Sequence, residues 1–281
     1  MKIQVISVKS IQKFKEYLIE TEKADATIEK YIRDITAFAA WLDGKIPDKC
    51  KVLEYKGVLI QKYKPASVNS VLSSLNAFFE YCSWFKLKVK NIKLQRQIFS
   101  DSKKQLTKEE YGKLLDAAKA KGNERLYLIM QTICVLGIRV SELKYITVQA
   151  IRNMRTEISC KGKTRTVLIP KNLCRLLKKY ADHKNIKNGP VFITKTGQPV
   201  NRSNIWSDMK QLCKIAGVSR DKVFPHNLRH LFARTYYSIE KDIVRLADIL
   251  GHSNVNTTRI YTMETGETHR LQIQKLGLLR C

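Results

Sequence analysis

Apolar side chains recur at helical spacing along most of this chain, and one segment breaks that pattern. Helical stripes of this kind are the core-facing sides of amphipathic helices. Between Ile151 and Pro170 the residues are instead rich in β-branched types, and Lys161-Gly162-Lys163 stands in their middle as a turn. This pattern is typical of a β-hairpin with a basic tip. The chain is therefore predicted to be mainly α with a small β-hairpin, an α+β fold. The helical stripes of the first hundred residues are formed by Ile11, Phe14, Tyr17 and Leu18, by Ile28, Tyr31, Ile32, Ile35, Phe38, Ala39 and Leu42, and by Val68, Val71, Leu72, Leu75, Phe78, Phe79 and Cys82.

A loss of periodicity near residue 95 predicts two domains. Residues 96–105 are basic and polar, which is typical of a linker. A new helix then starts at Thr107, which can cap it together with Glu110 three residues later. The predicted division is an N-terminal helical domain over 1–95, a linker over 96–105 and a second domain over 106–281. The total of 281 residues suits two domains of ordinary size.

The charge balance points to a polyanionic partner. The chain has 52 Lys and Arg residues against 25 Asp and Glu residues, a net charge of +27, and the positive residues are spread along its length. This distribution favours a wide basic surface that follows nucleic acid, although a lysine-rich solvated surface has the same composition. The seven cysteines contain no C-x-x-C pair, and no run of eighteen apolar residues occurs. Neither a disulfide framework nor a zinc site is indicated, and we expect a cytoplasmic protein without a membrane segment.

The segment from Pro225 to Tyr261 is the strongest functional signal. It holds three of the five histidines of the chain. His226 and Arg229 are three residues apart and share a helix face, His252 follows Leu250-Gly251, and Tyr261 comes nine residues after His252. Fixed positive charge, imidazole groups and a phenolic nucleophile are what a phosphodiester reaction needs. Gly251 is a predicted helix C-cap, and Asn256 a predicted N-cap of the helix carrying Tyr261.

Two further segments carry isolated cationic residues. Arg139 lies in Gly137-Ile138-Arg139-Val140-Ser141-Glu142-Leu143, where the glycine can break a helix and Glu142 can reach back to orient the guanidinium. Lys161 stands at the tip of the predicted hairpin. Taken singly, each feature has a plain structural interpretation: a surface salt bridge for Arg139, a solvated side chain for Lys161.

The segments together resemble the tyrosine recombinase (phage integrase) family, and within it the two-domain Xer-like members. The resemblance covers nearly the whole chain, and a match to all of its motifs is highly specific. One departure is Cys160 where the family usually has a glycine before the hairpin lysine, so Lys163 and Arg165 are rivals to Lys161. By the resemblance, the catalytic residues are Arg139, Lys161, His226, Arg229, His252 and Tyr261.

The resemblance implies that Tyr261 attacks a scissile phosphate, forms a 3′-phosphotyrosyl bond and frees a 5′-hydroxyl, which then completes strand exchange through a Holliday junction. Arg139, Arg229 and His252 would hold the phosphate, with His226 assisting proton removal from Tyr261. Lys161 would protonate the leaving oxygen. No carboxylate cluster and no phosphate-binding loop of the G-x-x-x-x-G-K-[ST] type is found, so neither a metal nor a nucleotide cofactor is expected.

The resemblance also implies partners. The N-terminal helices would form a core-DNA-binding domain that closes on duplex DNA with the catalytic domain. The tail, about 264–281, would dock on a neighbouring protomer, or pack on its own domain. The expected assembly is a homotetramer on synapsed double-stranded DNA with inverted arm sites, formed from monomers. Helices of the N-terminal type begin by about Ser10, which favours a short target.

Two other functions remain open. Ile243–Leu250, Gly251 and Asn256–Tyr261 can be interpreted as a helix-turn-helix of a non-catalytic, sequence-specific DNA-binding regulator. That interpretation leaves Arg139, Lys161 and His226 without a role. A type IB topoisomerase shares the phosphotyrosine chemistry but does not recombine two sites. A recombinase could serve integration, excision, inversion or dimer resolution.

Overall fold

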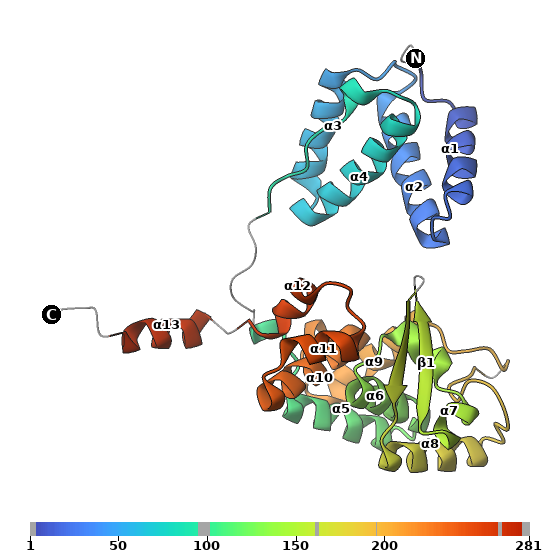
Figure 1. The fold of residues 1–281 in the computed structure, drawn as a ribbon, viewed down its shortest axis with the longest axis vertical. Helices are drawn as coiled ribbons and strands as arrows, with labels where there is room; N and C mark the ends of the chain where they lie inside the picture. The colour runs from blue at the N-terminus through green and yellow to red at the C-terminus, as the bar shows by residue number, and fades with distance from the viewer. Residues whose placement is uncertain (1–3, 95–101, 161–162, 195, 264–265, 277–281) are drawn as a thin grey trace. The chain divides into compact units, whose positions relative to one another are not determined.

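The computed structural model describes residues 4–94, 102–160, 163–194, 196–263 and 266–276 (Figure 1). The chain divides into two compact units, Met1–Arg96 and Gln97–Cys281, which we describe separately. Much of the predicted linker, 96–105, falls on residues outside the described ranges. Both units are mainly helical and the second carries a two-stranded antiparallel sheet, so the predicted α+β class is confirmed.

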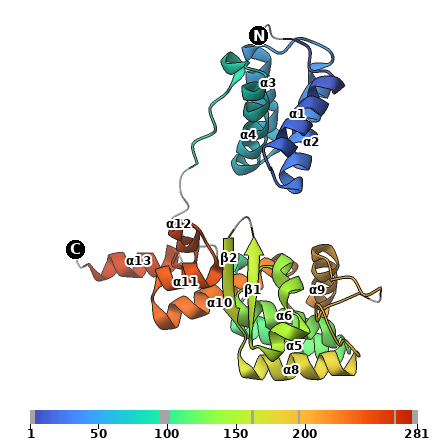
Figure 2. The same cartoon turned by 45° about the vertical axis from the view of Figure 1, so that its right-hand side comes forward.

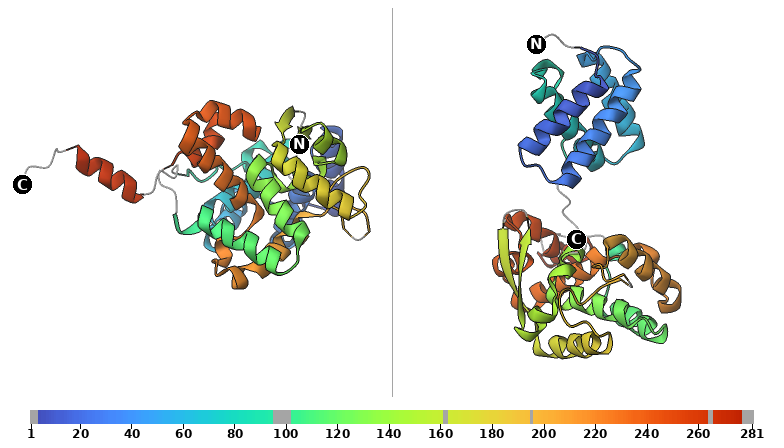
Figure 3. Two further views of the ribbon diagram at one scale, coloured as in Figure 1. Left: turned by 90° about the horizontal axis from the view of Figure 1, so that it is seen from below. Right: turned by 90° about the vertical axis from the view of Figure 1, so that its right-hand side faces the viewer.

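In the described part of the N-terminal unit, three of the α-helices follow the predicted apolar stripes, and α3 (Lys49–Lys62) is an additional helix for which no stripe was predicted. Figure 3 shows them packed side by side. Phe14, Phe38 and Phe78 are fully buried where the stripes meet, and Pro65 stands at the start of its helix, where its missing N–H costs nothing. The helices are α1 (Val8–Glu20), α2 (Asp25–Leu42), α3 (Lys49–Lys62) and α4 (Pro65–Tyr81), followed by the short 3₁₀ helix η1 (Phe85–Leu87).

One buried charge lies between α2 and α4. The Asp34 carboxylate accepts hydrogen bonds from the Lys30 ammonium and, at 2.8 Å, from the Ser74 hydroxyl. Lys30 also donates to the Ser70 carbonyl at 2.9 Å. The acid and the ammonium neutralise each other, so the burial of Asp34 is compensated by partners on the neighbouring helix.

The second unit combines helices with one hairpin. Its hydrophobic core is formed mainly by α5, α6, α8 and α9, with α10 packed against α6. The helices are α5 (Lys108–Ala120), α6 (Glu124–Leu136), α7 (Val148–Arg152), α8 (Lys171–His183), α9 (Arg202–Ala216), α10 (Pro225–Glu240), α11 (Ile243–Leu250), α12 (Val255–Thr258) and α13 (Gly266–Lys275). The 3₁₀ helices are η2 (Ser102–Lys104), η3 (Val140–Tyr145), η4 (Arg220–Lys222) and η5 (Arg259–Tyr261).

The predicted hairpin is present as β1 (Arg155–Cys160) and β2 (Lys163–Leu168), paired in register from Arg155 opposite Leu168 to Cys160 opposite Lys163. Two hydrogen bonds fasten β1 to η3: the Tyr145 hydroxyl donates to the Ser159 carbonyl, and the Thr156 hydroxyl donates to the Tyr145 carbonyl, both at 2.8 Å. Figure 2 shows β2 on the side of the hairpin that faces α10 and α11. The hairpin therefore stands beside the helices that carry the histidine and arginine motifs.

Two predicted helix boundaries are confirmed and one is corrected. Thr107 and Glu110 form the predicted capping box of α5, and Gly251 ends α11 in the left-handed conformation with φ +66°. The prediction for Asn256 is wrong, because Asn254 is the N-cap of α12 and its side chain accepts from the Asn256 N–H at 2.8 Å. Tyr261 lies in the 3₁₀ turn η5, one element later than predicted.

None of the helices in the described ranges is long and apolar enough to cross a membrane.

Candidate active site

Helix α10 brings three motif residues to one place. Pro225 opens the helix at a position where proline is tolerated. His226, Arg229 and His230 follow on neighbouring faces, since residues three and four apart are close on a helix. Arg229 is fully buried, with an exposed fraction of 0%, and His226 is exposed. Sequence spacing correctly placed the two side chains on one helix, but it could not show that one is buried and the other is at the surface.

Arg229 joins the ends of two helices. Its Nη1 donates to the Gly137 carbonyl beyond the end of α6, and its Nη2 donates to the Leu250 carbonyl at the end of α11, both at 2.7 Å. Terminal carbonyls of a helix lack intrahelical partners and carry partial negative charge, so a guanidinium suits both positions. Burial, with the charge of Arg139, lowers the pKa of Arg229 to about 10, and the side chain stays charged at neutral pH. Its Nε has no hydrogen-bond partner among the described residues.

Gly137 is required for this arrangement. It has φ +61°, and a Cβ there would lie 2.3 Å from the Phe232 ring. A larger residue at this position would collide with Phe232 on α10. The resulting shift would move the Gly137 carbonyl, which accepts a hydrogen bond from Arg229. The glycine thus allows α6 and α10 to approach closely at the site.

His252 is held between Arg229 and Thr258. Its Nε2 lies 3.0 Å from Arg229 Nη2, and its Nδ1 lies 2.9 Å from the Thr258 hydroxyl. A guanidinium can only donate, so Nε2 accepts and Nδ1 carries the proton of the neutral ring. Burial, with the charge of Arg229, lowers the pKa of His252 to about 4. In this arrangement Nε2 has no proton to donate to a phosphate. His252 must therefore gain a proton on Nε2, or turn its Nδ1–H away from Thr258, before it can donate to a phosphate.

Tyr261 packs against the same imidazoles. Its ring lies edge-on to His230 at a centroid distance of 5.0 Å, and nearly parallel to His252 at 6.3 Å. Its exposed fraction is only 5%. Burial raises the pKa of the Tyr261 phenol, and the neighbouring charges of Arg229 and Arg139 oppose that shift. The phenol is therefore protonated at neutral pH.

The two histidines of α10 are in contact and both favour the neutral form. Their rings are 4.4 Å apart, edge to face. Desolvation, followed by the charges of Arg229 and Arg139, lowers the pKa of His226. Desolvation, with His226 next, lowers the pKa of His230 to about 3, and the buried His230 Nε2 has no hydrogen-bond partner in the part of the chain that the structure describes.

Glu142 orients Arg139 as the sequence predicted. Arg139 Nη1 donates to Glu142 Oε1 at 2.9 Å, and the Arg139 backbone N–H donates to Oε2 at 2.8 Å. About a third of the Arg139 side chain remains exposed. Burial acts to raise the pKa of Glu142, but the Arg139 N–H and the charge of Arg165 hold it below its usual value. Arg139 is therefore fixed by an ionised carboxylate with part of its guanidinium open to solvent.

The structure thus brings together five of the six predicted residues, whereas Lys161 lies outside the described ranges. Of the two rivals to Lys161, Arg165 turns its guanidinium onto Glu142, and the side chain of Lys163 is not described. Sequence reasoning gave no role to Thr258 or His230. The second histidine of the α10 motif was a signal for His230, but nothing in the sequence marked Thr258. The five that meet are Arg139, His226, Arg229, His252 and Tyr261.

In the described part of the chain, no three His, Cys, Asp or Glu side chains are grouped so that they could hold a metal ion.

Comparison with known proteins shows the family of this chain. Residues 104–267 match the model of the phage integrase family. Tyrosine recombinase XerA of Pyrococcus furiosus is 27% identical over 99% of this chain and 98% of its own length. Tyrosine recombinase XerH of Campylobacter jejuni is 37% identical over 60% of this chain and 51% of its own length.

Solved structures share the fold. A lambda integrase dimer bound to a COC′ core site superimposes with a TM-score of 0.72 at 18% identity, covering 92% of this chain and 77% of that one. XerH bound to its difH substrate before cleavage gives 0.68 at 23% identity, covering 84% and 76%.

The family model covers more than half of the chain, so it defines the class of this protein. The chain belongs to the phage integrase family. It is an enzyme of site-specific DNA recombination, a tyrosine recombinase. The regulator and topoisomerase alternatives do not correspond to the relatives that it matches.

Proposed function

We propose that Tyr261 is the nucleophile that breaks and rejoins DNA strands. The phenolic oxygen attacks the scissile phosphorus, the bond to the 5′-oxygen breaks, and a 3′-phosphotyrosyl link remains. The freed 5′-hydroxyl of a partner strand later attacks that link and restores the phenol, through a Holliday junction. The observation that carries this proposal is the packing of Tyr261 beside Arg229 and His252, two groups that suit a phosphate.

Arg139 and Arg229 are the proposed phosphate-binding residues. Both remain charged, and planar guanidinium groups match the non-bridging oxygens of a phosphate. Arg229 has an unpartnered Nε, and Arg139 is partly exposed although Glu142 holds it. Fixed donors that stabilise charge on the pentacoordinate transition state are the largest expected contribution to the rate.

Proton transfer falls to two groups of different type. His226 is exposed and its pKa is lowered, so a neutral ring is available to assist proton removal from Tyr261. Lys161 is proposed as the general acid that protonates the leaving 5′-oxygen, by its place in the family motif. His252 binds the phosphate once it exchanges the hydrogen bonds of the DNA-free state.

The proposed nucleophile and one proposed phosphate-binding residue are covered by neighbouring side chains. Tyr261 and Arg229 are both buried, and the raised pKa of Tyr261 keeps the phenol protonated. DNA binding must therefore expose both groups. A phosphate placed among the cations adds negative charge there, which favours protonated imidazoles and weakens their contacts in the DNA-free arrangement.

The experiment is cleavage of a nicked suicide duplex, with covalent adduct measured on a denaturing gel. The wild-type protein forms the adduct. Tyr261→Phe keeps the packed ring, binds DNA and forms none, because the nucleophilic oxygen is gone. Adduct formed by Tyr261→Phe at the wild-type rate would show that another residue is the nucleophile.

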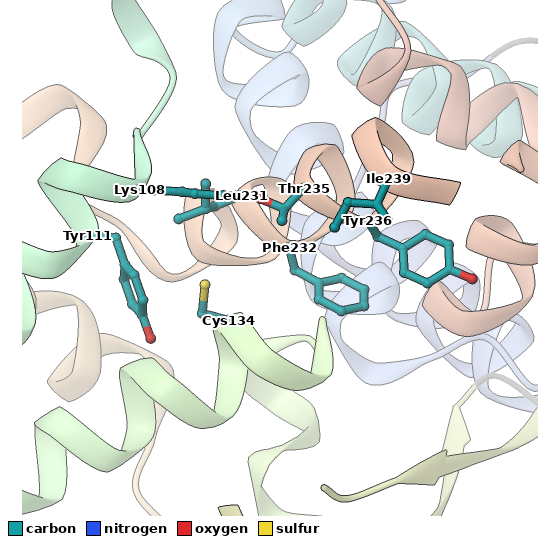
Figure 4. Close-up of a pocket in the computed structure, with 8 residues that line it drawn as sticks. All are labelled: Lys108, Tyr111, Cys134, Leu231, Phe232, Thr235, Tyr236 and Ile239. Carbon is teal, nitrogen blue, oxygen red and sulfur yellow. The ribbon is translucent and has the colours of Figure 1, made fainter. Parts of the chain in front are cut away.

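We propose further that the enzyme works as a homotetramer on two duplex sites with inverted arms, and that helix α13 joins its protomers. The apolar side chains Leu271 and Ile273 of α13, and Leu276 directly after it, are all more than half exposed. The catalytic unit has an apolar pocket of about 470 Å³, shown in Figure 4, that suits such a helix. We assign this pocket to α13 of the next protomer, since a head-to-tail contact can close a ring. The pocket is lined by Lys108, Tyr111, Cys134, Leu231, Phe232, Thr235, Tyr236 and Ile239.

Deletion from Gly266 onward tests the tail. Binding to a one-arm duplex should survive, because it depends on phosphate and base contacts of one protomer. Cooperative filling of two arms and recombination should be lost. Recombination at the wild-type rate would show that the tail does not join protomers. Loss of one-arm binding would count against a purely intermolecular role.

A further inference from the structure

Arg165 on β2 has contacts that the proposed chemistry does not use. The sequence made it a rival for the general acid, yet a guanidinium is too weak an acid for that task and this one is turned inward. Only 14% of its side chain is exposed. Its Nη2 donates to Glu142 Oε2 at 2.6 Å, and its Nη1 donates to the carbonyl of Ile249.

The first contact makes Arg165 a neighbour of Arg139 through one carboxylate. Glu142 Oε1 is bound by the Arg139 guanidinium, while Oε2 is bound by Arg165 and by the Arg139 N–H. Arg139 and Glu142 alone carry no net charge, whereas the three side chains together carry one positive charge. Without Arg165, Glu142 would neutralise Arg139 and draw its guanidinium toward the protein interior. Arg165 thus preserves the positive field that a phosphate needs.

The second contact ties Arg165 to the segment that carries His252. Ile249 and Leu250 present consecutive carbonyls at the end of α11, and Arg165 and Arg229 each bind one of them. Gly251 follows with its Cα against the Arg165 stem, since a Cβ there would lie 2.5 Å from Arg165 Cδ. His252 is the next residue. Two guanidinium groups therefore hold the helix end from which His252 projects.

We infer that Arg165 is a positioning residue that couples the hairpin to both halves of the phosphate site, to Arg139 through Glu142 and to His252 through the end of α11. The inference rests on the proposed function, since it assumes that Arg139 and His252 meet the scissile phosphate. A 1 Å misplacement of such groups costs a large part of the rate while the remaining DNA contacts persist. Arg165 itself touches neither the phosphate nor the tyrosine.

The test compares Arg165→Met with Arg155→Met on the suicide duplex at saturating DNA. Methionine keeps much of the apolar stem and removes every donor. Arg165→Met should lower the cleavage rate about 100-fold, measured at a temperature at which circular dichroism shows the DNA complex folded, with a dissociation constant within about threefold of wild type. Arg155 lies exposed on β1 of the same hairpin, so its variant should cleave within about threefold of wild type.

Two readouts separate positioning from a loss of folded protein. In a Glu142→Gln background the additional penalty of Arg165→Met should fall below about tenfold, because the carboxylate through which Arg165 acts is gone. On a duplex with a neutral methylphosphonate at the scissile position, the penalty should also shrink, because less charge needs Arg139. A penalty that is the same in both backgrounds and on both substrates would overturn the inference.

Arg165→Lys covers the case in which Arg165→Met does not fold. Lysine keeps the charge and the stem, but one ammonium cannot bind the carboxylate and the carbonyl with the geometry of a guanidinium. It should cleave more slowly than wild type by at least about tenfold, and cleavage at the wild-type rate would overturn the inference. Failure of the wild-type protein itself to form adduct would instead contradict the proposed function.

Discussion

Each unit of this enzyme buries charge, and the two clusters differ in whether that charge is balanced. In the N-terminal unit, Asp34 and Lys30 neutralise each other and Ser74 completes the hydrogen bonding. In the catalytic unit, Arg139 and Arg165 both bind the Glu142 carboxylate, Arg229 contributes a further positive charge nearby, and the histidines beside them favour the neutral form. The first cluster is complete within the protein, whereas the second has an excess of positive charge.

Buried side-chain atoms without a hydrogen-bond partner also distinguish the two clusters. Among the described residues, the buried side-chain atoms without a partner are Arg229 Nε, His230 Nε2 and Arg234 Nε, and all three lie on α10. A buried donor without a partner costs free energy, so its persistence needs an explanation. The phosphate contact proposed above would give Arg229 Nε a partner. On that proposal the balanced cluster stabilises the fold, and the cluster with excess positive charge binds an anion.

Arg229→Lys should have the largest effect on the cleavage rate. The ammonium keeps the charge but cannot bind both helix ends and a phosphate, so cleavage should fall by about 10³-fold. The measurement is single-turnover adduct formation at saturating DNA. Arg234→Lys is the matched control, because Arg234 is a partly buried arginine on the same helix whose partners are Gln105 and Leu106. Equal losses for the two variants would mean that Arg229 acts only through stability.

Lys161→Ala should lower cleavage of ordinary DNA by about 10²-fold or more, the usual contribution of a general acid. A duplex with sulfur at the bridging 5′ position needs no proton on its leaving group, so it should be cut at nearly the wild-type rate. Lys163→Ala is the comparison, since Lys163 is the second lysine of the same sequence segment and begins β2. If the sulfur-containing duplex restores cleavage by Lys163→Ala and not by Lys161→Ala, the general acid is Lys163.

The balanced cluster should affect stability and not chemistry. Asp34→Asn leaves the Lys30 ammonium without its counter-charge, and we expect a loss of roughly 2 kcal/mol in the free energy of unfolding. Glu29→Gln, an exposed neighbour on α2, should change it by less than about 0.5 kcal/mol. Urea denaturation gives both values. A cleavage rate constant reduced in Asp34→Asn at saturating DNA would contradict the division into structural and functional clusters.

The smallest expected effect is that of His230 on the pH dependence of the free energy of unfolding. Its pKa is about 3 in the folded protein and near 6.5 when unfolded, so the unfolded state binds the additional proton. The stabilisation is full above pH 6.5 and is lost as pH falls toward 3. We expect His230→Phe to reduce the loss of unfolding free energy between pH 7 and pH 5 by roughly 1 kcal/mol, after discounting for partial exposure. If the free energy of unfolding depends on pH in the same way in the wild type and in His230→Phe, His230 does not contribute to acid sensitivity.

Local patterns predicted most of the fold, because helices, caps and hairpins depend on neighbouring residues. The capping box at Thr107 and the hairpin around residues 161–162 are of this kind. The error at Asn256 shows the limit, since Asn254 is an equally good cap two residues earlier and only the observed chain path selects it. The role of Lys161 stays a prediction, because that residue is outside the described ranges.

Long-range contacts could not be predicted from spacing. Arg165 meets the Ile249 carbonyl 84 residues away, and Arg229 meets Gly137 over 92 residues. The motif identified Arg229 and His252, but their burial and the proton on His252 Nδ1 depend on such contacts and on Thr258. Sequence therefore predicts which residues are present at the site, and packing decides their protonation and access.

Our central proposal is that Arg229 of α10 and Arg139 together bind the scissile phosphate. A crystal structure of Tyr261→Phe bound to an intact duplex tests it most directly. We predict a phosphate oxygen within hydrogen-bond distance of Arg229 and of Arg139, with position 261 facing the phosphorus and the Lys30–Asp34–Ser74 contacts unchanged. A complex in which Arg229 keeps its present partners and meets no phosphate would contradict the account.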